Sequence, residues 1–267
     1  MPLAVCATPI GNLEDVTLRV LRELEEADLV LCEDTRHTRR LLERHGVVAR
    51  LVSYHEHNEA QRTAAVLPRL EAGERVALVS DAGLPGISDP GVRLVAAARE
   101  AGVPVTVLPG PSAVETALVA SGFGTDSFQF LGYLPRGSGE RRELWDEIAR
   151  RPWAFVAFES PQRVASSLAS LAEALPDRPL AVCRELTKRY EEVVRGTASE
   201  LAERFSEGAK GEITIVVGPA QVEAGDDVPA VDAVAELVGM GLSRRSAADV
   251  VSRLTGVSRN RLYRGSL

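Results

Sequence analysis

The sequence has little cysteine and no long run of apolar residues. Its three cysteines, Cys6, Cys32 and Cys183, lie far apart, and none belongs to a Cys-x-x-Cys pair. Free, buried thiols in a reducing compartment are the simplest interpretation. No apolar run approaches the roughly 18 residues that would span a bilayer, and no N-terminal stretch joins basic residues to an apolar segment. We therefore expect a soluble, cytoplasmic protein.

Motifs that bind phosphate groups or metal ions are also missing. No Gly-x-Gly-x-x-Gly follows a predicted strand, and no Gly-x-x-x-x-Gly-Lys-Ser/Thr occurs, which argues against a nucleotide-dependent oxidoreductase or phosphotransferase. His55 and His57 follow a predicted strand two residues apart, an arrangement in which two imidazoles can share a metal. No third ligand stands at a useful spacing, so we expect no metal site.

Positive charge is scarce over most of the chain and concentrated at its end. The formal net charge is -7 over 267 residues, and with 45% hydrophobic content the chain can bury one large core or two modest ones. Between residues 243 and 267, however, six arginines face a single aspartate, a local balance of +5. The overall charge argues against nucleic-acid binding, whereas the terminal cluster favours binding of an RNA backbone.

Strands and helices alternate along the first 121 residues. We predict strands near 3–7, 28–32, 49–53, 75–79 and 103–108. We predict helices near 17–26, 36–45, 58–72, 91–101 and 112–121. Alternation of this kind produces an α/β fold, with a parallel-rich sheet covered by helices.

The same alternation restarts after residue 122. We predict further strands near 128–130, 153–158, 180–184, 191–197 and 212–217, and helices near 140–150, 161–174 and 198–206. The sequence therefore indicates an N-terminal α/β domain at 1–121, a C-terminal α/β domain at 122–220 and a linker at 221–229.

The last segment, 230–267, is predicted to be a small helical unit with a basic end. A first helix is followed by Ser243, which caps a second helix, and a turn at Gly256 leads through a new cap at Ser258 to a basic helix at 259–264. Helix, glycine turn and basic helix are the outline of a helix-turn-helix. A small helical cap with a solvated arginine face is the alternative.

Three strand ends in the first domain carry small, proline-rich turns. The longest, 80–91, follows the strand at 75–79 and contains three glycines and two prolines, which break both helix and strand. The other two turns are 8–12 and 109–112. Open α/β sheets hold small ligands at the ends of their strands. Together the three turns predict a cofactor cleft.

Six segments of the chain carry a resemblance to a known family. In order along the chain they are 8–15, 80–91, 109–113, 158–161, 184–192 and 211–214. They resemble the signature segments of the 16S ribosomal RNA 2′-O-methyltransferases of the tetrapyrrole methylase superfamily, and the resemblance covers nearly the whole chain. It implies a two-domain tetrapyrrole-methylase-like (class III methyltransferase) fold and a homodimer. It also implies methyl transfer from S-adenosyl-L-methionine to the ribose 2′-oxygen of a cytidine in 16S rRNA of the small ribosomal subunit.

By the same resemblance, residues from both domains contact the cofactor. In the N-terminal domain they are Pro9, Ile10, Asp81, Gly83, Leu84, Ile87, Ser88, Ser112 and Ala113. In the C-terminal domain they are Phe158, Cys183, Ile213 and Thr214. Ordinary strand core is the alternative interpretation for Phe158 and Ile213.

Methyl transfer is an in-line displacement, so the acceptor oxygen must be aligned with the sulfonium methyl. A ribose hydroxyl also needs a group that takes its proton. The candidates, each beside a predicted strand end, are Glu33, Asp34, Glu159 and Glu185. Ion pairing within Asp34–Arg36 and Arg184–Glu185 is the alternative role, and the sequence singles out no one base.

Basic residues in several segments are candidates for contact with rRNA. They are Arg36, Arg39, Arg40, Arg136, Arg184, Lys188, Arg189, Arg244, Arg245, Arg259, Arg261 and Arg264. A charge run is also typical of a solvated helix face. Two rival functions stay open, a tetrapyrrole (porphyrinoid) methylase and a noncatalytic RNA-binding protein. The arginine-rich tail argues against the first, and uptake of S-adenosylmethionine distinguishes the second.

Overall fold

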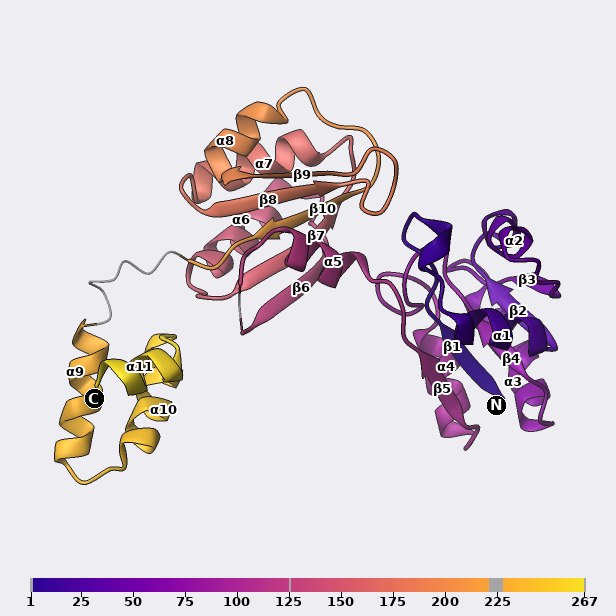
Figure 1. Cartoon of the computed structure of the whole chain (residues 1–267), viewed down its shortest axis with the longest axis horizontal. Coiled ribbons are helices and arrows are strands. Elements are labelled where there is room, and N and C mark those ends of the chain that lie inside the picture. The colour runs from indigo at the N-terminus through magenta and orange to yellow at the C-terminus, as the bar shows by residue number, and fades with distance from the viewer. Residues whose placement is uncertain (1, 125, 221–227, 267) are drawn as a thin grey trace. The chain divides into compact units, whose positions relative to one another are not determined.

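The computed structural model describes residues 2–124, 126–220 and 228–266 (Figure 1). The contacts of the chain divide it into two compact units. The first unit comprises Met1–Ala120, Cys183–Val193 and Gly211–Thr214. The second unit comprises Ser121–Val182, Val194–Lys210 and Ile215–Leu267. Two short segments from late in the chain therefore group with its N-terminal residues.

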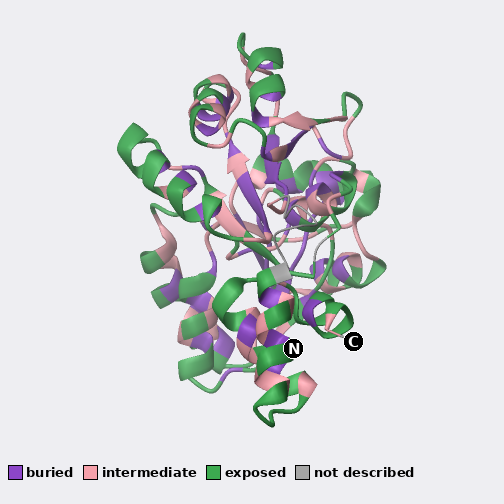
Figure 2. Ribbon diagram, turned by 90° about the vertical axis from the view of Figure 1, so that its left-hand side faces the viewer, coloured by how far each residue is buried: buried purple, intermediate pink, exposed green. Residues whose placement is uncertain are grey.

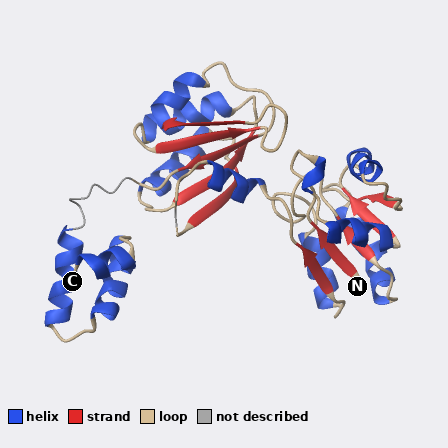
Figure 3. Ribbon diagram, viewed as in Figure 1, coloured by secondary structure: helices blue, strands red, loops and turns tan. Residues whose placement is uncertain are grey.

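The first unit is built on a parallel sheet of five strands. The strands are β1 (Leu3–Cys6), β2 (Leu29–Cys32), β3 (Leu51–Ser53), β4 (Val76–Leu78) and β5 (Val105–Leu108). The helices are η1 (Leu13–Asp15), α1 (Leu18–Glu26), α2 (Thr35–Arg44), α3 (Glu59–Glu71), α4 (Val92–Glu100) and α5 (Ala113–Ala120). The order across the sheet is β3-β2-β4-β1-β5, and every pair of neighbours is parallel. The predicted parallel sheet is confirmed in this unit, where strands and helices alternate (Figure 3).

Both faces of this sheet are buried under helices. Leu3 and Val5 of β1 belong to a buried cluster with residues of α3 and α4, whereas Ala4 and Cys6 belong to a cluster with residues of α1 and α2. Since side chains alternate between the two faces of a strand, α3 and α4 cover one face and α1 and α2 the other. Strands β1, β2 and β4 are accordingly apolar throughout, as parallel strands buried on both sides must be. Helices, in contrast, carry both buried and exposed residues (Figure 2).

The sheet has a topological switch point between β2 and β4. The chain leaves β2 through α2 toward β3 at one edge, but leaves β4 through α4 toward β5 at the other edge. The two crossovers therefore diverge from neighbouring strands. In open α/β sheets the crevice at such a point, outside the carboxyl ends of the strands, is where ligands bind.

The second unit contains most of another five-stranded sheet. Its elements are β6 (Phe128–Tyr133), α6 (Ser138–Ala149), β7 (Ala154–Glu159), α7 (Val164–Ala174), β8 (Pro179–Arg184), β9 (Glu192–Thr197), α8 (Ala198–Arg204) and β10 (Ile213–Val217). The strand order is β6-β7-β10-β8-β9, and β6 runs parallel to β7. The end of β8 and the starts of β9 and β10 are counted with the first unit.

Strand β6 is longer than the sequence predicted. It was expected to end at residue 130, before Gly132, but it continues to Tyr133 with a shift of register between Phe130 and Tyr133. Gly132 has φ 68°, a left-handed conformation that glycine adopts without strain. Such an irregularity bends a strand and re-aims the side chains beyond it. Sequence periodicity alone does not show where a strand continues through a bulge.

The C-terminal residues form three helices, α9 (Val228–Gly239), α10 (Arg244–Thr255) and α11 (Arg259–Gly265). Ser243 caps α10 by accepting a hydrogen bond from the Ser246 amide at 3.1 Å, and Gly256 ends it with φ 76°. The three predicted helices are therefore confirmed. Ser258 stands at the expected N-cap of α11, but its side chain makes no capping hydrogen bond. The predicted linker, 221–229, lies outside the described residues except for its last two, which begin α9.

The other predicted elements are present with ends that differ by a few residues. All three cysteines are free and buried, as expected, and burial raises the pKa of Cys6 and of Cys183 to about 12. Within the described ranges, none of the helices has the length and apolar character needed to cross a bilayer.

Candidate functional site

Two of the predicted turns are joined directly to each other in the first unit. The Thr8 amide donates to the Gly83 carbonyl at 2.8 Å, and the Gly83 amide donates back to the Thr8 carbonyl at 3.1 Å. The Thr8 hydroxyl, which is buried, donates to the Ser80 carbonyl at 3.0 Å. The turn after β1 and the loop after β4 are therefore one hydrogen-bonded structure, as their positions on neighbouring parallel strands require.

The third turn lies against the other two. A β-carbon placed on Gly110 would lie 2.9 Å from the β-carbon of Ala7, and one placed on Gly83 would lie 3.7 Å from the Pro111 carbonyl oxygen. Real β-carbons do not approach as closely as the first of these distances, so only glycine fits at position 110. The three small turns meet at the carboxyl edge of the sheet and leave little side-chain bulk there.

A fourth signature segment, 184–192, also packs against the first turn. The Asn12 amide donates to the Thr187 hydroxyl at 3.0 Å, although the two residues are far apart in the chain. A β-carbon on Gly11 would lie 2.5 Å from Cγ of Lys188 and 2.7 Å from Oγ1 of Thr187. Gly11 is therefore required for this close approach.

Backbone strain is confined to the same loops. Among the described residues, the non-glycine residues with positive φ are Ser88 (62°), Glu185 (52°) and Thr187 (65°). Ser88 belongs to the loop after β4, and the other two belong to segment 184–192. Left-handed conformations are costly for residues with a side chain and persist at functional sites where the surroundings enforce them. The strain thus marks the loops that the sequence had singled out.

Three carboxylates gather around the switch point, which we call the carboxylate cluster: Glu33, Asp81 and Asp89. Asp81 accepts a hydrogen bond from the Asp34 amide at 3.0 Å, which ties the ends of β2 and β4 together. Burial, and after it the charge of Asp81, raises the pKa of Glu33. Burial, and after it the charge of Glu33, raises the pKa of Asp89 to about 6. Like charges in a half-buried site hold one another's protons more tightly.

Asp89 was not among the residues proposed from the sequence. It lies in the same glycine-rich loop as Asp81, between Ser88 and Pro90. This position in the loop is the only feature of the sequence that could have indicated a functional role for Asp89. It also lines a hollow of about 670 Å³ in the first unit. The lining residues are Glu56, Glu59, Ser88, Asp89, Pro90, Gly91, Val92 and Arg93. A hollow of this volume is in the range of small-molecule sites.

Asp34 has a different environment from the cluster. It caps α2 by accepting from the Arg36 amide at 2.8 Å and pairs with the Arg36 guanidinium at 2.7 Å. These hydrogen bonds from Arg36 hold the pKa of Asp34 well below its ordinary value. The pair lies at the surface, with the Arg36 side chain 86% exposed. Asp34 and Arg36 therefore form the surface ion pair that the sequence left open as an alternative.

The other two candidate bases are occupied by internal partners. Glu159, whose side chain is fully buried, binds Arg163 at 2.5 Å and accepts from the Ser167 hydroxyl at 2.5 Å. Glu185 binds Lys188 at 2.9 Å and accepts from the Glu212 amide at 2.9 Å, and these contacts lower its pKa. The acceptor positions of both carboxylates are therefore occupied, and the lowered pKa of Glu185 makes that residue a weak proton acceptor in addition.

The predicted cofactor residues lie in two groups. All but one belong to the first unit, and Phe158 belongs to the second. Pro9 and Ile10 are buried, whereas Ile87 and Ser88 are exposed in the loop after β4. The remaining first-unit residues are the partly exposed Leu84, Ser112 and Ala113, the buried Cys183, Ile213 and Thr214, and Asp81 and Gly83, described above. Cys183 donates to the Ala117 carbonyl at 3.8 Å, and its raised pKa makes it an unreactive thiol.

The predicted RNA-binding residues are spread over both units. Arg36, Arg39 and Arg40 are exposed on α2. Arg184 pairs with Glu192 at 3.1 Å, and its charge also contributes to the lowered pKa of Glu185. Arg189 lies over the ring of Tyr190. Arg136 is exposed before α6. On α10 and α11 the arginines are Arg244, which is partly exposed, and Arg245, Arg259, Arg261 and Arg264, which are exposed.

Comparison with known proteins identifies the family. Residues 2–202 match the family model described as Tetrapyrrole (Corrin/Porphyrin) Methylases. A solved structure of uroporphyrin-III C-methyltransferase from Thermus thermophilus, complexed with S-adenyl homocysteine, matches with a TM-score of 0.57. The match covers 81% of this chain and 96% of that one at 22% identity, so it shows a shared fold. The chain belongs to the tetrapyrrole methylase family, and the expected α/β fold is confirmed.

Relatives named Ribosomal RNA small subunit methyltransferase I are much more similar in sequence. The protein of Mesorhizobium japonicum is 43% identical over 265 residues, which cover 98% of this chain and 90% of the relative. The protein of Micromonospora olivasterospora is 44% identical over 265 residues, which cover 98% of this chain and 85% of the relative. Within the family, the chain falls in the ribosomal RNA small subunit methyltransferase I group, and the resemblance seen in the sequence is confirmed.

Proposed function

We propose that this protein transfers a methyl group from S-adenosylmethionine to the ribose 2′-oxygen of a cytidine in 16S rRNA. The observation that carries the proposal is the 43% identity, over 98% of the chain, to a protein named Ribosomal RNA small subunit methyltransferase I. The match to the family model ends at residue 202, whereas the similarity to this relative covers 98% of the chain and so reaches into the arginine-rich tail. A methylase acting on a tetrapyrrole needs no such tail, so the observation favours an RNA substrate.

We propose that the cofactor lies against the joined turns of the first unit. S-adenosylmethionine has an adenine, a ribose diol, a sulfonium and an amino-acid head, and when bound it supplies an electrophilic methyl group. Turns with little side-chain bulk suit such a ligand, and Gly110, whose β-carbon would meet Ala7 at 2.9 Å, keeps the surface open. Backbone groups of Pro9 and Ser112 would hold its polar parts, because the amide and the carbonyl of Gly83 are both already bonded to Thr8.

The carboxylate cluster is the proposed proton acceptor for the ribose hydroxyl. A general base works best when its pKa lies near the working pH. Burial and like charges raise the pKa of Glu33. They raise the pKa of Asp89 to about 6, which is close to neutral pH. Asp34 and Glu185 have lowered pKa values instead. Of the bases considered from the sequence, Glu33 therefore has the strongest support, with Asp89 as its neighbour.

The exposed arginines of α10 and α11 are the proposed contacts to the rRNA backbone. Phosphate contacts supply affinity without sequence information, and a cationic surface on one small element of an acidic protein is typical of such contacts. The family resemblance also suggests a homodimer. Light scattering of the purified protein in solution tests that state directly.

Two assays test the proposed function. Titration calorimetry with S-adenosylmethionine measures cofactor uptake, and incubation with small ribosomal subunits and labelled cofactor measures transfer to RNA. We expect both to be positive. Label on a porphyrinoid instead of rRNA would support the tetrapyrrole methylase. Tight rRNA binding without any cofactor uptake would support the noncatalytic RNA-binding protein.

A further inference from the structure

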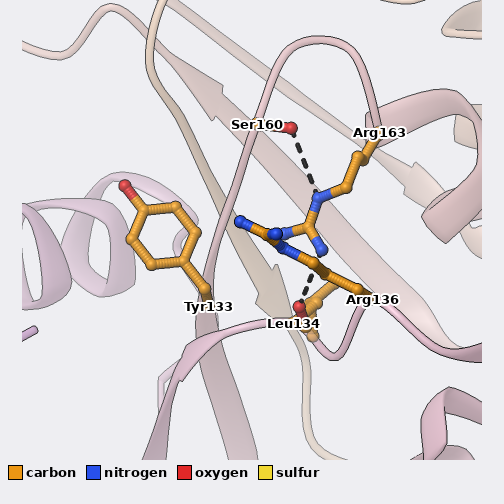
Figure 4. Close-up of a pocket in the computed structure, with 5 residues that line it drawn as sticks. All are labelled: Tyr133, Leu134, Arg136, Ser160 and Arg163. Carbon is orange, nitrogen blue, oxygen red and sulfur yellow. Dashed lines mark hydrogen bonds between the residues drawn. The ribbon is translucent and has the colours of Figure 1, made fainter.

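The second unit contains a cationic pocket that none of the roles above explains. Its volume is about 360 Å³. The residues that line it are Tyr133, Leu134, Arg136, Ser160 and Arg163 (Figure 4). They come from the last residue of β6 and from the loops that follow β6 and β7, which are neighbouring parallel strands. The pocket therefore stands at the carboxyl edge of this sheet, where parallel sheets present their functional loops.

The guanidinium of Arg163 is held in a fixed orientation. Its Nε donates to the Ser160 hydroxyl at 3.3 Å and its Nη1 donates to the Leu134 carbonyl at 3.1 Å (Figure 4). Its Nη2 pairs with the buried Glu159 at 2.5 Å. An arginine has five N–H groups, so these three contacts leave donors for a ligand. Because its side chain is 24% exposed, those donors can reach the pocket.

Arg136 brings a second guanidinium to the same pocket. The buried Arg141 donates to the carbonyls of Pro135 and Arg136 at 3.4 and 3.3 Å, which fixes the backbone beneath the Arg136 side chain. The ion pairs found among the described residues do not include Arg136, whereas Glu159 pairs with Arg163. The two guanidinium groups and one carboxylate leave a net positive charge at the pocket.

Tyr133 supplies an aromatic wall. The left-handed Gly132 and the register shift in β6 immediately precede it, so the bulge sets the direction of its side chain. Its ring packs edge-on against Phe158, with centroids 5.6 Å apart, yet the residue is 60% exposed. An aromatic ring that packs against a neighbour and is still largely exposed is suited to stacking with a nucleobase.

We propose that this pocket binds one nucleotide of a single-stranded RNA segment. The phosphodiester lies on Arg136 and Arg163, because planar guanidinium groups match phosphate oxygens, and the base stacks on Tyr133. The inference rests on the proposed function and adds to it a subsite for the RNA substrate. The carboxylate of the cofactor's amino-acid head is the other anion with matching chemistry, and the experiment separates the two.

The test compares two substitutions with two matched controls in the full-length protein. Arg136→Gln removes an exposed charge of the pocket, and Arg142→Gln removes another exposed charge, six residues further along the chain, that does not line the pocket. Tyr133→Ala removes the ring, and Tyr133→Phe retains it. The measurements are the Kd for a short single-stranded RNA that contains cytidine, over a range of salt concentrations, and the Kd for S-adenosylmethionine.

We expect Arg136→Gln and Tyr133→Ala each to weaken RNA binding about tenfold, with cofactor affinity unchanged and both controls close to wild type. Arg136→Gln should also lower the slope of log affinity against log salt by about one. Wild-type RNA affinity in both variants would overturn the subsite, and so would weaker cofactor binding in Arg136→Gln. Methylation of ribosomal subunits by the wild type, measured on the same preparation, tests the proposed function separately.

Discussion

At the scale of single residues, the candidate site depends on positions where no side chain fits. Gly11 is one of them, because a β-carbon there would lie 2.5 Å from Lys188 and 2.9 Å from the Leu186 carbonyl oxygen. The carbonyl belongs to the backbone and cannot turn aside as a flexible side chain can. The contact between the first turn and segment 184–192 therefore requires glycine at position 11.

We predict that Gly11→Ala destabilises the protein by about 1–3 kcal/mol, the usual cost of overpacking. It should also weaken cofactor binding, because the first turn must move away from Thr187. Urea denaturation and calorimetry measure the two effects. The matched control is Gly139→Ala in α6, where a β-carbon meets nothing within 4 Å and the change should stabilise slightly. Equal stability of the two variants would contradict the packing argument.

Asp89 provides a prediction about pH. Its folded-state pKa is raised from an ordinary value of 3.8 to about 6, so the folded protein holds this proton more tightly than the unfolded chain does. The ionised form is penalised by burial, and the penalty grows as pH rises from about 4 to 6. Asp89→Asn should therefore be more stable than the wild type near pH 7 and lose that advantage near pH 4. Thermal unfolding across this range is the measurement, and a difference that does not vary with pH would refute the shift.

Only part of the candidate site could be predicted from the sequence at this scale. The turns around Thr8, Gly83 and Gly110 were predicted because glycine and proline restrict backbone conformation locally. Asp89 was missed because its raised pKa depends on burial and on Glu33, which approaches it only in the folded chain. In the same way, a linear sequence does not show which partners the buried Glu159 binds.

At the scale of elements, strands and helices were predicted well where their hydrophobic pattern is strong. Strands β1, β2 and β4 are apolar throughout and begin and end within a residue or so of their predicted bounds. The prediction failed at β6, where Gly132 permits a bulge instead of ending the strand. The cap expected from Ser258 also failed, since a suitable residue type does not guarantee its side-chain geometry.

The junction of β7 and α7 gives a prediction for a buried ion pair. Glu159 at the end of β7 is fully buried, and both Arg163 and Ser167 bind it. Removing the positive partner leaves an uncompensated buried charge, so Arg163→Gln should cost about 3 kcal/mol in the free energy of unfolding. The double variant Glu159→Gln/Arg163→Gln should recover part of that loss.

Urea denaturation of both single variants and the double variant completes a thermodynamic cycle for this pair. Simple additivity of the two single losses would show that Glu159 and Arg163 do not stabilise each other. The exposed Arg136 has no acidic partner in the described ion pairs, and Arg136→Gln should leave the unfolding free energy nearly unchanged.

At the scale of the whole molecule, charge is distributed unequally. The chain carries a net charge of -7, yet its last 25 residues carry a local excess of arginine. An acidic body limits nonspecific attraction to nucleic acid, so a cationic tail would dominate the approach to rRNA. This distribution of charge supports the proposed role of the tail in binding rRNA.

We predict that Arg245→Gln/Arg264→Gln raises the KM for ribosomal subunits severalfold and leaves the Kd for S-adenosylmethionine unchanged. Both arginines are exposed, and each removed phosphate contact should reduce the salt dependence of binding. The matched control is Arg19→Gln/Arg22→Gln, which removes two exposed charges from α1. If the two double variants had the same KM for ribosomal subunits, the tail would be a packing element and not a contact to rRNA.

The grouping of the chain into units shows a limit of sequence reasoning. The domains proposed at 1–121 and 122–220 follow the order of elements along the chain. In the structure, Cys183–Val193 groups with the N-terminal residues, partly through the hydrogen bond between Asn12 and Thr187. Contacts between residues so distant in sequence have no local signal, and an alternation of strands and helices cannot predict them.

The most direct test of the proposed 2′-O-methylation is to locate the transferred methyl group in the rRNA. After small ribosomal subunits react with the protein and labelled S-adenosylmethionine, the 16S rRNA is hydrolysed with alkali, which cannot cleave next to a methylated 2′-oxygen. We expect the label on the ribose of a cytidine, at a phosphodiester that resists cleavage. Label on a base, or no label in 16S rRNA under conditions where the cofactor binds, would contradict this expectation.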